Sequence, residues 1–354
     1  MLLSVASGSY AVHFNETAYR ELHTLLNAAS YTRIFILVDE NTHRFCLRAF
    51  LSRIEGDYIT ETITISAGEA YKNITTCLKV WNALAGHGAD RKSLLINLGG
   101  GVVSDLGGFV ASTYMRGIAY INVPTTLLAM VDASVGGKTG VDLGVLKNLI
   151  GVINTPEMVV IDSAFLSTLP ENQLKSGLAE MFKHGLIADA TYWNKLTALP
   201  GSRPDIPDAL IRESVCIKNT VVLQDPGERN RRKILNYGHT LGHAIESCFL
   251  NTPKPMLHGE AIAIGMIMAT YISNIMTGFP EKELKRIKEV MLGHFKKIRF
   301  SAADQNKIIA LLQHDKKNTG GKSNFVLLSD IGKPVLDQTV PETLLAQAFA
   351  YYKK

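Results

Sequence analysis

Hydrophobic positions follow two different periods along this 354-residue chain. Over roughly the first 160 residues, short apolar and β-branched runs alternate with segments of helical spacing. The runs expected to be strands are 33–38, 94–98, 118–123 and 158–161, and each stops at an Asp, a Gly or a Pro. Strands that alternate with helices are typical of an α/β domain with a mainly parallel sheet, because parallel neighbours need a crossover between them.

Beyond Asp162 the strand-like runs largely disappear. Apolar residues recur at helical spacing in four segments, residues 170–186, 207–223, 239–249 and 260–276. One strand-like run, 324–328, is expected near the C-terminus. Because a chain of this length usually exceeds what one hydrophobic core organises, two domains are expected. The pattern predicts a Rossmann-like α/β domain at residues 1–162 and a mainly α-helical domain at residues 163–354.

Composition narrows the class of protein. With 46% apolar and 19% charged residues, the chain has a globular rather than a disordered composition. The N-terminus lacks a basic segment followed by a sustained apolar stretch, so no signal peptide is expected. The longest apolar run, 261–276, is shorter than the ~18–20 residues of a membrane span and is expected to be a buried helix behind His258. The unpaired cysteines and the missing export signal favour a reducing cytoplasm, and no membrane partner is expected.

The net charge is +5, and the densest basic run is Arg229–Lys233. No stacking aromatic residues are interleaved with this run, and the sequence contains no nucleic-acid module signature. We therefore expect no nucleic-acid partner. A short basic cluster directly before a histidine motif suits a small anionic substrate better.

Three histidines and one glutamate have the chemistry of a catalytic metal site. His239 and His243 are four residues apart on a predicted helix, so their imidazoles share one face, and His258 follows a break at two prolines. Upstream, Glu180 lies in another predicted helix. Two ring nitrogens and one carboxylate oxygen leave the fourth position of a Zn²⁺ ion open, whereas a structural zinc site more often uses Cys. A single such histidine is more often a capping or surface residue, so the argument rests on the cluster. Spacing does not choose between His239 and His243.

Three glycines, Gly99–Gly101, directly follow a predicted strand, and Asp105 stands where a helix would begin. Glycines at this position let backbone N–H groups approach a pyrophosphate at the positive end of the helix. Ser104 replaces the third glycine of the G-x-G-x-x-G fingerprint, so the loop by itself is equally compatible with a tight structural turn. Asp39 ends an earlier strand and is positioned to accept a hydrogen bond from a ribose hydroxyl. By sequence alone, it is more readily a helix N-cap followed by Glu40.

The segment Ser134–Thr139 has the glycines and the lysine of a P-loop, but Asp132 stands where the Walker A motif requires glycine. No clean strand-to-helix transition surrounds it. The segment is instead predicted to be a polar loop in which Lys138 faces phosphate.

Several of these segments follow one another in the order seen in 3-dehydroquinate synthases: Gly99–Asp105, Tyr114–Gly117, Val123–Leu128, Val131–Thr139, Lys147–Asn148, Gly177–Lys183 and Asn236–His243. The chain resembles this family of sugar-phosphate cyclases from about residue 68 to residue 317. It departs from the family pattern at two places. Ser104 stands where the family usually has Gly, and Asp142–Leu146 replaces the usual Asn-His-Pro-x-Gly.

The resemblance implies three sets of site residues. The metal ligands would be Glu180, His239 and His258. The NAD-binding residues would be Asp39, Glu69, Lys72, Gly100, Gly101, Val102, Asp105, Thr125, Thr126, Lys138 and Lys147. The residues around the substrate would be Arg116, Asp132, Lys138, Lys147, Asn148, Lys183, Lys218, Glu228, Arg232, Asn236 and His243.

The resemblance also implies an activity in aromatic amino-acid biosynthesis, on the shikimate pathway. The substrate would be 3-deoxy-D-arabino-heptulosonate 7-phosphate, and the products would be 3-dehydroquinate and phosphate. NAD would oxidise the substrate transiently and then reduce it again around phosphate elimination, before aldol cyclisation. Zn²⁺ or Co²⁺ would be the metal, and the protein would be a homodimer.

Three alternatives remain open from the residues. A sister cyclase would act on another heptulose or hexose phosphate. A metal-dependent polyol dehydrogenase of the glycerol dehydrogenase type would share the two-domain plan, but would not need so many cations directed at phosphate. A non-enzymatic NAD-binding module would leave the glutamate and histidine set without a purpose.

Overall fold

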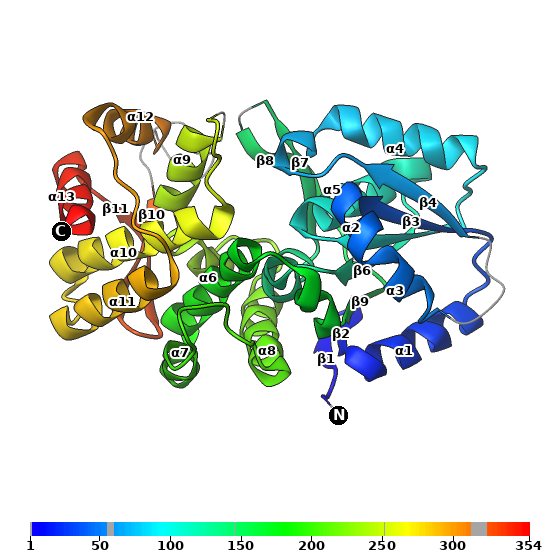
Figure 1. The fold of residues 1–354 in the computed structure, drawn as a ribbon, viewed down its shortest axis with the longest axis horizontal. Coiled ribbons are helices and arrows are strands. Elements are labelled where there is room, and N and C mark those ends of the chain that lie inside the picture. Colours follow the sequence, from blue (N-terminus) through cyan, green and yellow to red (C-terminus); the bar gives the residue numbers. More distant parts are fainter. Residues whose placement is uncertain (1, 55–59, 145, 251, 313–323) are drawn as a thin grey trace. The chain divides into compact units, whose positions relative to one another are not determined.

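The computed structural model describes residues 2–54, 60–144, 146–250, 252–312 and 324–354. The chain forms two compact units, Met1–Pro170 (unit 1) and Glu171–Lys354 (unit 2) (Figure 1). The sequence pattern predicts the boundary at Asp162. The 3-10 helix η4 (Ser163–Thr168) that follows this residue is part of unit 1. Tyr19 on the first helix donates a hydrogen bond to Asp162, at 2.8 Å, directly before η4.

Among the described residues, unit 1 contains a seven-stranded sheet with the strand order β1-β2-β9-β6-β5-β3-β4. The strands are β1 (Val5–Ser7), β2 (Tyr10–Phe14), β3 (Ile34–Asp39), β4 (Thr60–Ile65), β5 (Leu94–Gly99), β6 (Ala119–Pro124) and β9 (Met158–Ile161). The neighbouring pairs from β2 to β4 are parallel, and β1 pairs with β2 in the antiparallel direction. The parallel sheet and the four strands expected from the sequence are confirmed.

The connection order gives this sheet a topological switch point. From β3 the chain passes to β4 on one side and then to β5 on the other side of β3. Ligands of open α/β sheets bind beyond the carboxyl ends of the strands at such a point. The expected nucleotide site of unit 1 therefore lies where β3 and β5 end.

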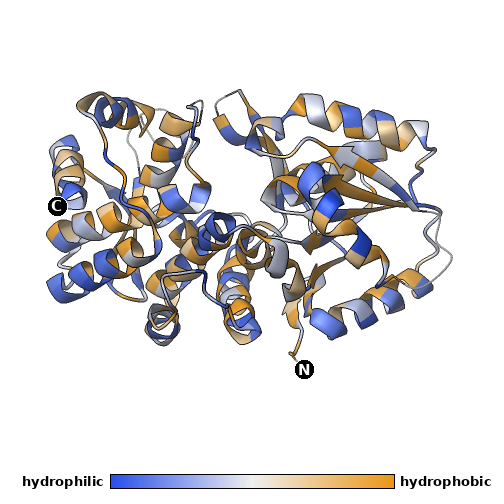
Figure 2. Ribbon diagram, viewed as in Figure 1, coloured by the Kyte–Doolittle hydropathy of each residue, from blue (hydrophilic) through white to orange (hydrophobic). Residues whose placement is uncertain are grey.

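The helices of unit 1 are α1 (Asn15–Ala28), α2 (Glu40–Phe45), α3 (Leu47–Leu51), α4 (Ile74–Gly86) and α5 (Gly101–Thr113), with the short helices η1 (Glu69–Tyr71), η2 (Tyr114–Arg116) and η3 (Ala129–Ala133). Strands β3 and β5 are almost fully buried, as expected for strands covered on both faces. Buried side chains such as Leu37, Val80 and Leu106 join β3, α4 and α5 in one core. Figure 2 shows the apolar residues along the strands and hydrophilic residues on the outer helix faces.

A hairpin of β7 (Lys138–Leu143) and β8 (Leu146–Ile153) forms a separate two-stranded sheet in unit 1. The sequence pattern did not predict these strands. β8 is mostly exposed and its apolar residues do not alternate, so the period that identifies a half-buried strand is missing. The expectation of a polar loop over residues 134–139 is wrong at its end, because Lys138 is the first residue of β7.

Unit 2 is mainly helical. Its elements are α6 (Glu171–Ala188), α7 (Ala190–Thr197), α8 (Asp208–Gln224), η5 (Arg231–Asn236), α9 (His239–Phe249), α10 (His258–Thr277), α11 (Glu281–His294), α12 (Ala302–Leu312), β10 (Asn324–Asp330), β11 (Lys333–Thr339) and α13 (Glu342–Lys353). The four helices and the strand expected from the sequence are confirmed. β11, which pairs with β10, was not predicted. The helices α8, α11 and α13 begin directly after prolines, whose fixed φ near −60° suits a helix start.

Helix α10 is the core of unit 2. It is the one described helix that is long and apolar enough to cross a membrane, and 72% of its apolar stretch is buried within the protein. It packs against α6, α9, α11 and α13. This burial agrees with the helix expected behind His258.

Candidate functional site

Three helices of unit 2 present the predicted metal-binding side chains. Glu180 lies in α6, His239 and His243 lie in the first two turns of α9, and His258 is the first residue of α10. The residue before α9, Gly238, has φ +76°, a left-handed conformation that favours glycine. This turn fixes where α9 begins and therefore where His239 points.

Glycines allow the three helices to approach closely. A Cβ atom on Gly259 would overlap the backbone of Ser176 in α6, and one on Gly265 would overlap the carbonyl oxygen of Gly238. The contact between α6 and α10 also has a hydrogen bond, from the backbone N–H of Gly259 to the Ser176 hydroxyl at 2.9 Å. The glycines that flank the histidines in the sequence are therefore packing residues that bring the imidazoles to Glu180.

Glu180 is the centre of this cluster and is completely buried. Its Oε1 lies 3.3 Å from His239 Nε2 and 3.4 Å from His258 Nε2, and its Oε2 pairs with Lys183. Among the described residues, neither oxygen has a hydrogen-bond partner of good geometry. Burial raises the pKa of Glu180, but Lys183 and His239 outweigh it, and the net pKa is well below the usual value. The residue is therefore a buried carboxylate anion.

The orientation of His239 leaves a lone pair facing Glu180. Its Nδ1 lies 3.1 Å from the Tyr237 carbonyl oxygen, and because a carbonyl only accepts, Nδ1 carries the proton. Burial, followed by the charge of Lys183, lowers the pKa of His239 to about 4, so the ring is neutral near pH 7. Its Nε2 then has a lone pair 3.3 Å from a carboxylate oxygen. A cation between the two atoms would turn this repulsion into coordination.

His258 lies between two carboxylates. Its Nε2 faces Glu180, and its Nδ1 lies 3.1 Å from Glu246 Oε2. Burial lowers the pKa of His258, but Glu246 and Glu180 outweigh it and raise the pKa to about 10. A metal ion would have to displace the proton on Nε2, as it does for any imidazole ligand. Glu246 was not among the predicted residues, although it lies two helical turns after His239 on α9.

His243 joins the same cluster. The ring nitrogens of His239, His243 and His258 include atoms that lie within 4.8 Å of one another. The ring centroid of His243 lies 5.2 Å from that of His239 and 5.7 Å from that of His258. The structure thus brings all four predicted residues together. The fit to a divalent cation is chemical: three imidazoles and one buried carboxylate are zinc-type donors.

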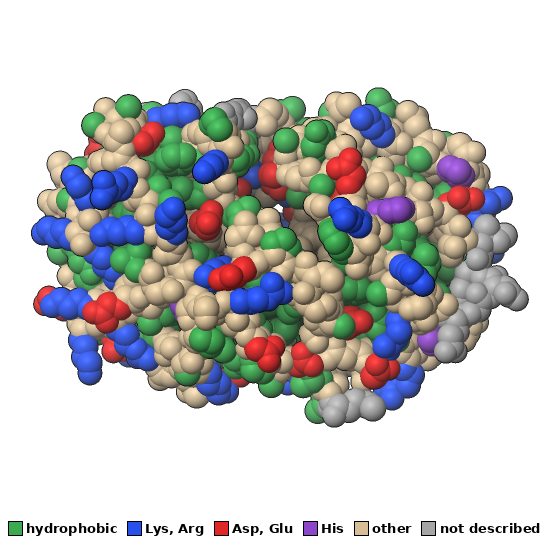
Figure 3. All heavy atoms as spheres, viewed as in Figure 1, with side chains coloured by type: hydrophobic (Ala, Val, Ile, Leu, Met, Phe, Trp, Pro, Cys, Tyr) green, Lys and Arg blue, Asp and Glu red, His purple; other side chains and the backbone are tan. Residues whose placement is uncertain are grey.

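Three cations of unit 2 are unusually buried. Lys183, Lys218 and Arg232 expose 1%, 5% and 2% of their surface, and the elements that carry them, α6, α8 and η5, pack against one another. Most other Lys and Arg residues lie on the surface, where Figure 3 shows them mixed with acidic residues. Lysine and arginine are rarely buried unless anions compensate them. Lys183 has such an anion in Glu180, so this set is part of the buried charge network of unit 2.

An acidic residue shapes the loop that leads to α9. Asp225 accepts hydrogen bonds from the backbone N–H groups of Arg229, Asn230 and Arg232, at 3.0, 2.7 and 3.0 Å. These N–H groups, that of Asn230 foremost, lower the pKa of Asp225. Sequence reasoning missed this residue because its role is to fold a loop.

Two more of the predicted substrate residues meet in this loop. Asn236 donates a hydrogen bond to Glu228 Oε1 at 3.1 Å, and Arg232 donates one to the Pro226 carbonyl at 2.9 Å. Glu228 has φ +54°, so the backbone at this residue is in a sparsely populated region. The loop thus presents Glu228, Arg232 and Asn236 together.

In unit 1, the glycine loop joins β5 to α5 as predicted. The Thr125 N–H donates to the Gly99 carbonyl at 3.0 Å, and a Cβ atom on Gly100 would lie 3.0 Å from the Thr126 side chain. Ser104, the departure from the family pattern, turns its hydroxyl toward the carbonyls of Gly100 and Gly101, at 3.2 and 3.1 Å. The serine is buried within the helix and leaves the start of α5 intact. The loop and the helix N-terminus, with Val102 in the first turn, therefore keep an anion-binding arrangement.

Asp39 ends β3, beside the end of β5, and it is a helix N-cap. Its Oδ1 accepts from the Thr42 N–H at 2.8 Å, and the Thr42 hydroxyl accepts from the Asp39 N–H at 2.9 Å. The capping interpretation of the sequence is confirmed. The role toward a ribose stays a prediction.

Five of the predicted nucleotide and substrate residues form a cluster of ion pairs and hydrogen bonds. Lys72 is buried and donates to Asp105 Oδ2 and to Asn148 Oδ1, both at 2.6 Å. Burial lowers the pKa of Lys72, but Asp105 and Glu69 outweigh it, and the net pKa is raised. Lys147 donates to Glu69 Oε1 at 2.7 Å. The cluster links η1, α5 and the hairpin.

Asp142 makes hydrogen bonds to residues on both sides of it in the chain. Its Oδ1 accepts from the Asn148 N–H at 2.7 Å, and its own N–H donates to the Lys72 carbonyl at 2.9 Å. Asn148 has φ +51°, a conformation that these contacts support. Asp142, the first residue of the divergent segment, therefore connects β8 to Lys72. Val145 lies outside the described residues.

The remaining predicted residues of unit 1 lie in three separate elements. Arg116 is an exposed residue of η2 with φ +71°, Asp132 lies in the π-helix η3, and Lys138 is exposed at the start of β7. The structure therefore brings the residues around Lys72 into direct contact, whereas these three residues lie in different elements.

Comparison with known proteins agrees with the geometry. Residues 62–176 match the family described as 3-dehydroquinate synthase N-terminal, and residues 177–318 match the C-terminal counterpart. The 3-dehydroquinate synthase of Parabacteroides distasonis is 38% identical over 336 residues, which cover 94% of this chain and 95% of that protein. The chain belongs to the 3-dehydroquinate synthase family.

Other relatives extend this result. The 3-dehydroquinate synthase of Dictyoglomus thermophilum is 42% identical over 293 residues, which cover 81% of each chain. A solved structure of 2-deoxy-scyllo-inosose synthase, complexed with carbaglucose-6-phosphate, NAD⁺ and Co²⁺, has a TM-score of 0.84 at 27% identity, with 98% of each chain covered. The resemblance read from the sequence motifs is confirmed, and so is the fold class.

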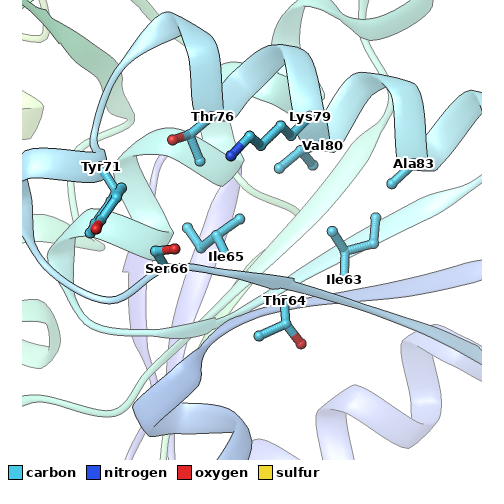
Figure 4. A pocket seen from close by; sticks show the side chains of 9 residues that line it. All are labelled: Ile63, Thr64, Ile65, Ser66, Tyr71, Thr76, Lys79, Val80 and Ala83. Atoms are coloured by element: carbon cyan, nitrogen blue, oxygen red, sulfur yellow. The ribbon is translucent and has the colours of Figure 1, made fainter.

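A pocket on unit 1 lies apart from the family motifs. It is lined by β4, η1 and α4, including Ile63, Ile65, Tyr71, Thr76 and Lys79, which Figure 4 shows around the hollow. None of the predicted NAD-binding residues of this 3-dehydroquinate synthase family member lines it. The pocket is therefore not assigned to the nucleotide.

Proposed function

We propose that this chain converts 3-deoxy-D-arabino-heptulosonate 7-phosphate to 3-dehydroquinate and inorganic phosphate, with NAD and Zn²⁺ or Co²⁺ as cofactors. The observation that carries the proposal is the buried Glu180 carboxylate with two imidazole Nε2 atoms at 3.3 and 3.4 Å. Membership of the 3-dehydroquinate synthase family supports the reaction. The 2-deoxy-scyllo-inosose synthase relative was solved with NAD⁺ and Co²⁺, which supports the cofactors.

In this proposal, the ligands of the metal are Glu180, His239 and His258. When bound, NAD takes up and returns a hydride, and the cation polarises a substrate hydroxyl. The chain keeps Glu180 ionised by pairing it with Lys183, and it directs a neutral His239 Nε2 toward the same point. These features direct an ionised oxygen and a ring-nitrogen lone pair to one point, which are donors that a divalent ion accepts.

The proposed NAD site is the carboxyl edge of the sheet in unit 1. The N–H groups at the start of α5 would receive the pyrophosphate, because they carry the positive end of the helix dipole. The residues assigned to this site are Asp39, Glu69, Lys72, Gly100, Gly101, Val102, Asp105, Thr125, Thr126, Lys138 and Lys147.

The substrate carries a carboxylate and a phosphate, and the chain has cations for both. Lys183, Lys218 and Arg232 are buried, so each contact with an anion would be made with little competing water. The other residues assigned to the substrate are Arg116, Asp132, Lys138, Lys147, Asn148, Glu228, Asn236 and His243. We further propose a cytoplasmic homodimer of the shikimate pathway, without a nucleic-acid or membrane partner.

A combined assay of NADH and phosphate distinguishes this cyclase from a polyol dehydrogenase. Substrate, catalytic NAD⁺ and metal are added to the protein, and NADH absorbance and phosphate release are followed together. A cyclase that regenerates NAD⁺ releases phosphate on every turnover without net NADH. NADH that accumulates in step with product, without phosphate, would contradict the proposal and identify a dehydrogenase. A panel of other phosphorylated ketoses and hexoses tests for a sister cyclase, which would prefer one of those substrates.

A further inference from the structure

Glu246 is a buried carboxylate beside the metal-binding cluster, and none of the roles assigned above includes it. It lies in α9, seven residues after His239, so the two residues share a helix face. Its side chain is 8% exposed. Burying an ionised carboxylate costs desolvation free energy, so a partner that offsets this cost is expected.

The contact of Glu246 is on the far side of the His258 ring from Glu180. Oε2 of Glu246 lies 3.1 Å from His258 Nδ1, whereas His258 Nε2 lies 3.4 Å from Glu180 Oε1. An ionised carboxylate only accepts hydrogen bonds, so Nδ1 is the donor. When a metal ion displaces the proton on Nε2, the lone pair used for coordination is therefore on the Glu180 side. Since the two ring nitrogens face different directions, this Glu246 oxygen is an orienting partner of His258 and not a ligand at the same point.

His239 gives an internal comparison. Its Nδ1 donates to a backbone carbonyl, that of Tyr237, at 3.1 Å. Both rings therefore keep a proton on Nδ1 and direct Nε2 to Glu180, but only the acceptor of His258 is a side chain that also brings a negative charge. The acceptor of His258 can be changed by substitution, and the acceptor of His239 cannot.

We propose that Glu246 is a positioning residue that fixes the tautomer and ring orientation of His258 and strengthens divalent-cation binding through its charge. The inference rests on the metal centre of the proposed function. A carboxylate that orients a metal-binding imidazole makes the ring a better ligand, and losing such a partner typically weakens metal affinity by about 10–100-fold. The proposal assigns the gain to the contact at His258 Nδ1.

The test compares Glu246→Gln, Glu246→Ala and a matched control, Glu260→Gln. Glutamine keeps an acceptor oxygen for Nδ1 but removes the charge, whereas alanine removes both. Glu260 lies in the first turn of the same helix as His258, and its Oε2 accepts from the Leu257 N–H at 2.9 Å. Gln at this position retains an acceptor for that N–H group.

The affinity of the metal-free, full-length protein for Co²⁺ and Zn²⁺ is measured by competition with a chelator, without substrate or NAD. The visible absorption spectrum of the Co²⁺ form reports the ligand geometry. We expect weakening of about tenfold in Glu246→Gln and up to about 100-fold in Glu246→Ala, with an altered Co²⁺ spectrum in the alanine variant. Glu260→Gln should bind within about twofold of the unchanged protein. A purely structural role would lower the unfolding temperature of the metal-free protein and leave the affinity and the spectrum unchanged.

Two outcomes would overturn the proposal, and they are distinguishable. If the unchanged protein and all variants bind Co²⁺ with equal affinity, Glu246 does not position His258, and the proposed metal centre stands. If the unchanged protein binds neither Co²⁺ nor Zn²⁺, the metal centre of the proposed function fails, and the inference about Glu246 fails with it. If Glu246→Ala does not fold, the isosteric Glu246→Gln variant decides.

Discussion

The substitution Gly259→Ala tests whether the close contact of α6 and α10 builds the metal site. The new Cβ atom would lie 2.7 Å from the Ser176 carbonyl carbon, whereas an ordinary contact begins at 3.4 Å. The neighbour is backbone and cannot rotate away. The N-terminus of α10 must therefore move from α6 by about 0.7 Å or more, and His258, the preceding residue, moves with it.

Two effects follow from this shift. Overpacking of a tight interior contact costs about 1–3 kcal/mol of the free energy of unfolding. The distance from His258 Nε2 to Glu180 changes by about a third of a metal–nitrogen bond of ~2.0 Å. A ligand misplaced by this much should weaken Co²⁺ binding by at least about tenfold.

The matched control is Gly293→Ala in α11 of the same unit. Apart from its chain neighbours and the backbone of its own helix, no atom of the described residues lies within 4 Å of a Cβ placed there. Alanine in a helix is favoured over glycine by about 0.5–1 kcal/mol, so this variant should be as stable as the unchanged protein or more stable. Both substitutions add one methyl group to a glycine, so the variants differ in which atoms the methyl group contacts.

Fluorescence isolates the unfolding of unit 2. The sequence has two tryptophans, Trp81 in unit 1 and Trp193 in unit 2. Trp193 is buried and packs edge-to-face on Phe182 of α6, with ring centroids 5.5 Å apart. In a Trp81→Phe background, urea unfolding therefore reports unit 2, and chelator competition gives the Co²⁺ affinity. Equal stability and equal affinity of the Gly259→Ala and Gly293→Ala variants would refute the reasoning.

Two further predictions concern unit 1. Asp142→Leu should weaken NAD⁺ binding by about tenfold in calorimetry, because it removes the acceptor for the Asn148 N–H and leaves a backbone with positive φ unsupported. The control Asp142→Asn keeps an acceptor and should bind NAD⁺ within about threefold of the unchanged protein. Equal affinities of the two variants would contradict this role. Lys72→Met should destabilise unit 1 by about 3 kcal/mol in urea unfolding followed through Trp81, because Asp105 then lacks its buried partner. The exposed Lys79→Met should change it by no more than about 0.5 kcal/mol, and a similar loss in both variants would show that the ion pair is not the cause.

Much of the fold follows from periodicity. The strands β3, β5, β6 and β9 are short continuous apolar runs, as burial on both faces requires. The helices α6, α8, α9 and α10 have the period of 3.6 that burial of one face requires. The hairpin β7–β8 and the strand β11 were missed, because their exposed or half-exposed residues leave no alternation to detect. Periodicity reports which face is buried, so it does not identify elements that lie largely at the surface.

The sequence by itself determined which residue types are available for the chemistry. Motif order grouped Glu180, His239, His243 and His258, and it indicated the glycine loop at residues 99–101. Short-range geometry was also accessible, since the capping role of Asp39 depends on a residue only three positions away.

Only the tertiary structure decided how these groups face one another. The contact of Glu246 with His258 joins two helices, and the contact of Lys147 with Glu69 joins residues 78 positions apart. Such pairs are set by helix packing, which places Gly259 against the backbone of α6 and so brings His258 to Glu180. The local pattern of a sequence records how each segment folds. Distances between segments, and with them the tautomers and charges of the buried groups, arise only when the segments pack.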